Sequence, residues 1–499
     1  MKTLYYNFNW WEAGEPQRMI VEDGRVRNRG PVADDVVEAD ENIDLQGKTL
    51  YPAFVDNHCH ILPTGLDLQK LHLGACTSNQ DVLDLLSSEI RSVRPDRWLL
   101  AVHYDQNKFG GEFITKSELD SVSTSVPILL RHVNGHASIT NTTALRLARI
   151  ADDEPDPDGG SYRRGPDGNI DGVLLENAHE RVSRAVPNAT LREMVDAILL
   201  AGKKMAELGI CCASDMMTGR FNLEQELQAY QIAAQRNCAI QTRLYLQYSE
   251  VFDRSGNQKP LNLPNTRGCR VAGIKIFADG AIGSATAAIY GHYSGATTAG
   301  HRISRRATLA SETSELEVSG QLIYPRDRLN EMVRIAHEAG YQVAIHTIGD
   351  YSTDLVMDAY EQVDEPQRHR IEHAMILSDA QIERMAKLGC YCSMQPEFLT
   401  RFGNTYHAQL GSVRAAKLNR YRSVKDAGIP LSLSSDRPIV SGDPVIGIQS
   451  ASERPQGYDA SENLTYREAV LAYSAEGAKV TGDNFGSLEP GDPAIFAAR

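Results

Sequence analysis

Residues 49–60, TLYPAFVDNHCH, end an apolar run with two histidines, His58 and His60, that are separated by one residue. Side chains alternate between the two faces of a strand, so both imidazoles point the same way and Cys59 points the other way. Two imidazoles on one face of a strand end are either the start of a metal site or hydrogen-bonded histidines at an ordinary strand exit. The rest of the chain has to decide between these two interpretations.

Seven further apolar runs follow, and most of them precede a segment with helical periodicity. They cover residues 208–216, 238–248, 268–280, 340–350, 368–376, 389–397 and 429–438. Apolar residues spaced i, i+3 and i+4 predict helices in segments 191–208, 328–340 and 379–389. Glycine often precedes the next run, as expected at a helix C-terminus. Eight buried strands alternating with helices predict an α/β fold, a (β/α)8 TIM barrel.

The segments outside this repeat predict two additions to the barrel. Residues 1–49 and 481–499 are rich in turns and short strands, so both chain ends are expected to form one small β-sandwich domain; two unrelated peripheral segments are the alternative. The barrel then comprises residues 50–65 and 191–480. Residues 66–190 are too long for one crossover after the first strand, and we expect an insertion that covers the barrel mouth.

Composition and charge limit the partners of the protein. A chain of 499 residues with 42% hydrophobic residues can bury a large core, and its net charge of -14 argues against nucleic acid and anionic membranes as partners. No two of the cysteines form a CxxC pair, no apolar segment approaches the roughly 20 residues of a membrane span, and the N-terminus lacks a signal-peptide core. We therefore expect a soluble, cytoplasmic protein with a small-molecule substrate, as a homodimer or a monomer.

Polar residues occur near the carboxyl ends of five of the eight predicted strands, which converge on one mouth in a closed parallel barrel. They are His58 and His60 of the first run, Lys275 of the fourth, His346 of the fifth, His373 of the sixth and Asp436 of the eighth. Each alone has an ordinary explanation in packing or loop capping. An unpaired lysine between Ile274 and Ile276 is costly to bury, however, and the coincidence of all six predicts a metal site.

The sequence resembles the amidohydrolase superfamily, and within it the YtcJ-like branch that includes N-substituted formamide deformylase. The likeness runs over nearly the whole chain and its ordered set of motifs is specific. The motifs are YPAFVDNHCHI, HYDQNKF, RHVNGHASITNTTAL, GVLLENA, GIKIFADGAIGSATAAI, VAIHTIGD, RIEHAMILS, LSSDRPIVSGDP and GSLEPGDPA.

The resemblance implies a role for each of the six residues. His58 and His60 would bind the more buried metal, and His346 and His373 the second one. Lys275 would be carboxylated by CO2, and its carbamate would bridge the two metals, which fits a neutral amine in a desolvated, cationic site. Asp436 would bind metal and transfer the proton. Zn2+ suits this donor set, with manganese, iron or cobalt as alternatives.

The reaction expected from this site is hydrolysis of a non-peptide C–N bond, in an amide or an N-substituted formamide. Metal-activated hydroxide would attack the carbonyl, with Asp436 as the proton shuttle to the departing amine. His136 is a catalytic candidate that would stabilise the developing negative charge on oxygen, although a hydrogen-bonded loop histidine is an equally good interpretation.

Two departures from the family pattern concern the substrate. Arg437 follows Asp436 where relatives usually carry a small residue, and Asn134 stands where aspartate is common. Arg437 would bind an anionic substrate group, or it would pair with a loop carboxylate such as Asp443. The insertion contributes further candidates for the lining of the substrate pocket, namely His103, Asp105, Gln106 and Glu176.

Two other functions use the same residues. One is deamination of a cyclic compound, with a single metal and a structural Lys275. The metal stoichiometry and the dependence of activity on bicarbonate would distinguish this reaction from hydrolysis at a two-metal site. The other is a metal-binding regulatory protein without catalysis, which has no need of Asp436 as a proton shuttle.

Overall fold

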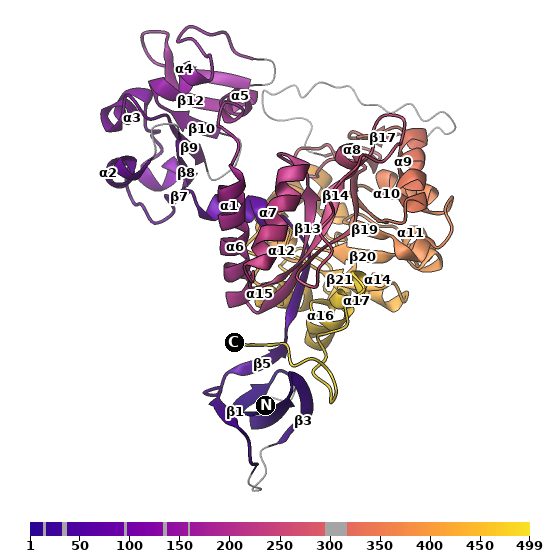
Figure 1. Ribbon diagram of the computed structural model, residues 1–499. Coiled ribbons are helices and arrows are strands. Elements are labelled where there is room, and N and C mark those ends of the chain that lie inside the picture. The colour runs from indigo at the N-terminus through magenta and orange to yellow at the C-terminus, as the bar shows by residue number, and fades with distance from the viewer. Residues whose placement is uncertain (13–15, 32–36, 94–96, 133–136, 158–159, 295–316) are drawn as a thin grey trace. The chain divides into compact units, whose positions relative to one another are not determined.

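The computed structural model describes residues 1–499 except 13–15, 32–36, 94–96, 133–136, 158–159 and 295–316 (Figure 1). The described residues form two compact units, one of Met1–Thr64 with Met194–Arg499 and one of Gly65–Glu193. The larger unit contains the barrel and both chain ends. The smaller unit is an insertion after the first barrel strand, as the sequence predicts.

A parallel sheet of eight strands, curved into a nearly closed barrel, forms the centre of the larger unit (Figure 1). The strands follow one another in chain order as β6 (Phe54–Cys59), β13 (Ile210–Thr218), β14 (Gln241–Gln247), β15 (Cys269–Phe277), β18 (Gln342–Thr347), β19 (Arg370–His373), β20 (Tyr391–Met394) and β21 (Leu431–Leu433). Each of the eight apolar runs overlaps one of these strands, and the predicted (β/α)8 barrel is confirmed.

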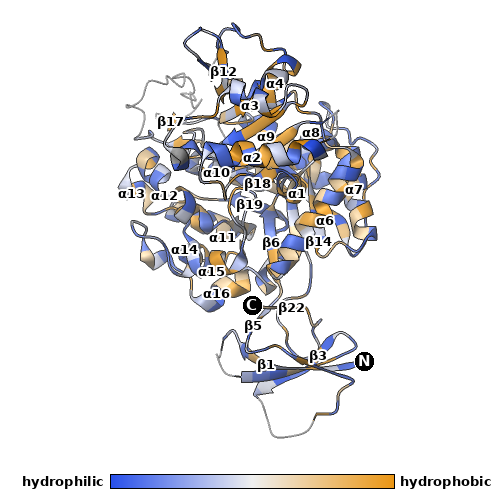
Figure 2. Cartoon of the chain, turned by 90° about the vertical axis from the view of Figure 1, so that its left-hand side faces the viewer, coloured by the Kyte–Doolittle hydropathy of each residue, from blue (hydrophilic) through white to orange (hydrophobic). Residues whose placement is uncertain are grey.

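Amphipathic helices connect the strands. Those with long apolar stripes are α6 (Leu191–Glu207), α7 (Leu223–Gln235), α9 (Arg326–Glu338), α10 (Asp350–Tyr360) and α11 (Asp379–Leu388). Helix α9 buries Leu329, Met332, Val333 and Ala336, which form one stripe at i, i+3, i+4 and i+7. Figure 2 shows hydrophobic and hydrophilic residues mixed in this way along α6 and α7. Helix α11 ends at Gly389, whose φ of 66° is the left-handed conformation that favours glycine.

Shorter elements complete the larger unit. They are α1 (Ile61–Leu68), which continues into the insertion, α8 (Tyr248–Val251), α12 (Glu397–Leu410), α13 (Ser412–Ala415), α14 (Tyr421–Asp426), α15 (Pro444–Ser452), α16 (Tyr466–Ala472), α17 (Ala475–Val480), and the strand pair β16 (Ile289–Tyr290) and β17 (Val318–Ser319).

Both chain ends contribute to a β-rich domain, as predicted. Its strands are β1 (Lys2–Trp10), β2 (Pro16–Glu22), β3 (Arg25–Pro31), β4 (Glu41–Asp44), β5 (Thr49–Pro52) and the C-terminal β22 (Phe496–Ala498). Strand β22 pairs antiparallel with β5, and all six strands belong to one hydrogen-bonded sheet. The first apolar run of the sequence is therefore divided at Ala53, with β5 in this sheet and β6 in the barrel.

The inserted unit has its own six-stranded sheet, in the order β11-β12-β10-β9-β8-β7. Its elements are β7 (Leu71–His72), β8 (Leu99–Tyr104), β9 (Ile128–His132), β10 (Ala137–Thr140), β11 (Gly160–Arg164) and β12 (Ile170–Glu176), with helices α2 (Asn79–Glu89), α3 (Lys116–Val122), α4 (Thr142–Leu147) and α5 (Asn177–Ser183). A separate core that includes Leu86, Tyr104 and Ile128 holds it together. Across the part of the chain that the structure describes, no helix is long and apolar enough to cross a membrane.

Candidate metal centre

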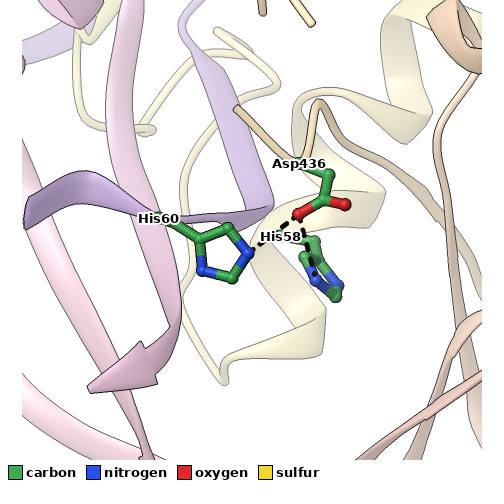
Figure 3. A group of neighbouring side chains, drawn as sticks. All are labelled: His58, His60 and Asp436. Carbon is green, nitrogen blue, oxygen red and sulfur yellow. Dashed lines mark ion pairs between the residues drawn. The ribbon is translucent and has the colours of Figure 1, made fainter. Parts of the chain in front are cut away.

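Three of the predicted ligands meet where the first and last barrel strands end. His58 lies in β6, His60 directly follows the end of that strand, and Asp436 lies just beyond β21. One nitrogen of each imidazole and one oxygen of Asp436 all lie within 4.8 Å of one another. Asp436 Oδ1 is 3.0 Å from His60 Nε2 and 3.6 Å from His58 Nε2, so one carboxylate oxygen faces both rings (Figure 3). This is a metal-binding arrangement of side chains.

Backbone hydrogen bonds between the first and eighth strands hold these three residues in place. Asp436 N donates to His58 O at 2.6 Å, and His60 N donates to Arg437 O at 2.8 Å. Asp436 itself has a φ of 59°, a left-handed backbone conformation that is uncommon for residues other than glycine. The closure of the barrel therefore places the carboxylate against the two imidazoles.

The other two predicted histidines adjoin this group. The ring centroids of His58 and His373 are 4.5 Å apart, and those of His373 and His346 are also 4.5 Å apart. His373 has a φ of 72°, a second left-handed backbone conformation at this rim. The structure thus brings the histidines of the first, fifth and sixth barrel strands into one continuous cluster.

The charge of Lys275 acts on His58, His346 and His373. Lys275 lies in β15 and is 2% exposed. Its Nζ is one of the buried polar atoms that have no hydrogen-bond partner among the described residues. Burial lowers the pKa of the Lys275 ammonium to about 8, while the charges of Glu372 and Asp436 act in the opposite direction. An amine in this position loses its proton more readily than that of an ordinary lysine.

Three of the four histidines have one ring nitrogen fixed by a hydrogen-bond acceptor. His58 Nδ1 donates to Glu372 Oε2 at 2.5 Å, and His346 Nε2 donates to the carbonyl oxygen of Gly280 at 3.1 Å. His373 Nδ1 donates to Gln395 Oε1 at 2.7 Å, because the amide nitrogen of Gln395 faces Ser434 Oγ. Each ring keeps its other nitrogen as a lone-pair donor, which is how ligand histidines are oriented.

The protonation states also suit a cation. Burial, followed by the charge of Lys275, lowers the pKa of His58 and lowers that of His346 to about 3, and burial lowers the pKa of His373 as well. These imidazoles are neutral at pH 7, the form in which histidine binds metal. Lys275 Nζ and Asp436 Oδ1 are both buried without a hydrogen-bond partner among the described residues. The donor set and these two unpaired atoms fit a divalent metal centre.

The sequence interpretation missed the residues that support the ligands: Glu372, Arg370, Gln395 and Asp279. A signal for two of them was present, because Arg370 and Glu372 put two opposite charges two residues apart in a buried strand. Arg370 Nε donates to Glu372 Oε1, and both side chains are fully buried. Such a pair inside a barrel strand indicates a buried ion pair next to His373.

Asp279 connects the loop after β15 to the loop after β18. It accepts hydrogen bonds from the backbone N–H groups of Ala288, Ile348 and Gly349, and from Ser352 Oγ. Its Oδ1 lies 3.6 Å from His346 Nε2. Asp279 therefore shapes the backbone that carries His346.

We expect Asp279→Ala to lower the free energy of unfolding by about 3 kcal/mol, because buried backbone N–H groups would lose their acceptor. Urea unfolding of the metal-free protein measures this change. The control is Asp379→Ala, which removes an exposed carboxylate bonded to Arg420 and should change the free energy of unfolding far less. Equal losses in the two variants would contradict this role of Asp279.

The remaining predicted residues are Arg437 of the larger unit, three residues of the inserted unit, and two residues that the structure does not describe. Arg437 donates to Ser441 O at 2.7 Å, and the expected alternative partner, Asp443, is instead paired with Arg499 at 2.7 Å. In the inserted unit, His103 stacks on His72 with ring centroids 5.1 Å apart, and Asp105 follows the end of β8. Glu176 is the last residue of β12, with its side chain outside the description. His136 and Asn134 lie outside the described residues.

Known proteins resemble this chain over nearly its whole length. The model of the amidohydrolase family matches residues 41–498. The chain is 28% identical to the putative amidohydrolase YtcJ of Bacillus subtilis, over 96% of this chain and 90% of that protein. It is 27% identical to the N-substituted formamide deformylase of Arthrobacter pascens, over 95% of this chain and 88% of that enzyme.

Among solved structures, an uncharacterized metal-dependent hydrolase from Pyrococcus furiosus has the same fold. Its TM-score is 0.76 at 23% identity, over 100% of this chain and 98% of that one. The likeness extends to the whole chain, including both ends and the insertion.

Proposed function

This chain belongs to the amidohydrolase family, and we propose that it hydrolyses a non-peptide carbon–nitrogen bond in an amide or an N-substituted formamide. The observation that supports this most directly is the convergence of His58, His60 and Asp436 within 4.8 Å at the rim of the barrel. The similarity to N-substituted formamide deformylase supports the type of bond.

Six residues would hold two metal ions. His58 and His60 would bind one, His346 and His373 the other, and Asp436 would complete the first. Lys275, carboxylated by CO2 on its buried, unpaired amine, would bridge both, and the anionic carbamate would offset the charge of two cations. Zn2+ suits this set, and manganese, iron or cobalt could replace it. Metal ions bound there would lower the pKa of water and polarise a substrate carbonyl.

Asp436 would move the proton. Its Oδ1 faces the imidazoles of His58 and His60 and accepts no hydrogen bond from the described residues. This oxygen would therefore be free to take a proton from the attacking water. The same carboxyl group would then deliver the proton to the departing amine. His136 would stabilise charge on the substrate oxygen, and His103, Asp105 and Glu176 would line the pocket; these assignments come from the sequence.

The surroundings of Arg437 support the proposal that the substrate carries an anionic group. Its Nη1 atom is buried and has no hydrogen-bond partner among the described residues, and the nearby Asp443 is engaged by Arg499. An unpaired guanidinium N–H next to Asp436 in the chain would bind a carboxylate or a similar anion. We further propose a cytoplasmic protein that acts as a homodimer or a monomer on a small molecule.

The experiment that tests the function is metal analysis followed by an activity screen. The purified protein should contain two divalent ions per chain, and the metal-replete form should hydrolyse members of a panel of N-formyl and N-acyl amines, with anionic members preferred. A chelator should abolish turnover, and added Zn2+ should restore it. One ion per chain with ammonia release from a cyclic compound would support the deaminase instead. Metal binding without any turnover would support the regulatory protein.

A further inference from the structure

The acceptor of the His58 N–H group differs in charge from the acceptors of the other histidines. His58 donates to the carboxylate of Glu372, with Nδ1 and Oε2 2.5 Å apart. His373 donates to the neutral amide of Gln395, and His346 donates to the carbonyl of Gly280. Of these three hydrogen-bond acceptors, only Glu372 is a carboxylate; the Asp279 carboxylate lies farther from His346, with Oδ1 3.6 Å from Nε2.

Glu372 is held in place by a buried hydrogen-bond network. Glu372 is fully buried, and Arg370 donates to both of its carboxylate oxygens, from Nη2 to Oε2 at 3.0 Å and from Nε to Oε1. Arg370 also donates to Asn57 O at 2.8 Å and to the hydroxyl of Tyr245 at 3.1 Å. These bonds fix the guanidinium and, through it, the position of the carboxylate.

An anionic acceptor affects a ligand histidine in two ways. It fixes the ring orientation and the tautomer, as any acceptor does, and it also raises the electron density of the ring, which strengthens the bond from the opposite nitrogen to a metal. A neutral amide or carbonyl supplies the first effect and much less of the second. His58 should therefore be a stronger metal ligand than His346 or His373.

We propose that Glu372 is a positioning residue that makes the two metal positions unequal, so that the ion bound by His58 is held more tightly than the ion bound by His346 and His373. This inference rests on the proposed function, since it requires both positions. Glu372 would therefore decide which ion is lost first, although it would not itself contact a metal ion.

The test is a chelator-competition titration of the Zn2+-loaded protein, with the visible spectrum of the Co2+-loaded form as a second readout. The wild type should release its ions in two steps. Glu372→Gln keeps an acceptor oxygen but removes the charge, and should weaken the tight step by about 10–100-fold while leaving the weak step unchanged. Gln395→Met removes the acceptor of His373 and should shift the weak step alone. The Co2+ spectrum should change in each variant at the corresponding step.

Two further variants separate this role from the loss of a buried ion pair. Asp483→Asn breaks a partly buried pair, with Arg243 at 2.7 Å near the beginning of β14, and should lower thermal stability without moving either step. Arg370→Met/Glu372→Gln removes the guanidinium that Glu372→Gln would leave unpaired. If the single variant does not fold, this double variant should fold and show the same loss at the tight step.

The outcomes are distinguishable. A wild-type protein that binds no metal or one ion overturns the proposed binuclear function before any variant is made. If the wild type releases its ions in two steps, and both steps are unchanged in Glu372→Gln or in the double variant, the inference is overturned. The proposed function is unaffected by that result. The inference is also overturned if Glu372→Gln and Gln395→Met shift the same step.

Discussion

Replacing Asp436 by Asn is expected to lower kcat by about 10²–10⁴-fold in the metal-replete protein. Asparagine has nearly the same shape and can still place an oxygen 3.0 Å from His60 Nε2, where Asp436 Oδ1 now lies. Its amide cannot accept a proton from water at neutral pH, and it has none to deliver to a departing amine. The chemical step should fail while the substrate still binds, so kcat should fall much more than KM rises.

The measurement is steady-state kinetics on the best substrate of the amide panel, with metal content determined on the same sample. Asp443→Asn is the matched control, because Asp443 lies seven residues further on and pairs with Arg499. That variant should keep kcat within about threefold of the wild type. An Asp436→Asn protein with both metals and most of its activity would rule out Asp436 as the proton shuttle.

The second large effect concerns Lys275. Lys275→Met keeps a long apolar side chain in the buried site of β15 but removes the amine that would react with CO2. Without the bridging carbamate, two divalent cations would face four neutral imidazoles and a single carboxylate, and their mutual repulsion would be less compensated. We expect the variant to retain one ion or none, and to lose activity by about 10²–10³-fold or more.

Metal analysis and intact-protein mass measurement under non-acidic conditions test the carbamate. The metal-free wild type, reconstituted with Zn2+, should regain activity faster in bicarbonate than in CO2-free buffer. Lys275→Met should respond to neither condition. Equal reconstitution of the wild type in both buffers, with two ions bound, would mean that Lys275 is not carboxylated and that another group bridges the metals.

Much of the barrel could be predicted from the sequence because its strands are buried on both faces. Such strands appear as apolar runs, and helices with one apolar stripe, such as α9, appear between them as a 3.6-residue period. The spacing of His58 and His60 placed two imidazoles together, and the apolar flanks of Lys275 indicated that its amine is buried. These features depend on residues that are close in the chain.

The division of the first apolar run at Ala53 could not be predicted in the same way. Strands β5 and β6 belong to one run of the sequence and are separated by one residue. Strand β5 belongs to the terminal sheet because it pairs with β1 and with β22, and β22 is some 440 residues away, as the pairing of Phe496 with Pro52 shows. A hydrogen-bond partner so distant in the chain leaves no local pattern in either strand.

The sequence by itself determined the barrel and the insertion after its first strand, and it predicts the six residues that would hold metal, because buried strands and their polar ends have local patterns. Only the tertiary structure decided how these residues are supported. The hydrogen bonds of Asp436 and His60 across the closure of the barrel, the carboxylate behind His58 and the pairing of Asp443 with Arg499 join residues from distant strands and loops. The physical reason is that a side chain's hydrogen-bond partner and charge environment depend on which segments pack against it, and the order of residues in one segment does not encode that choice.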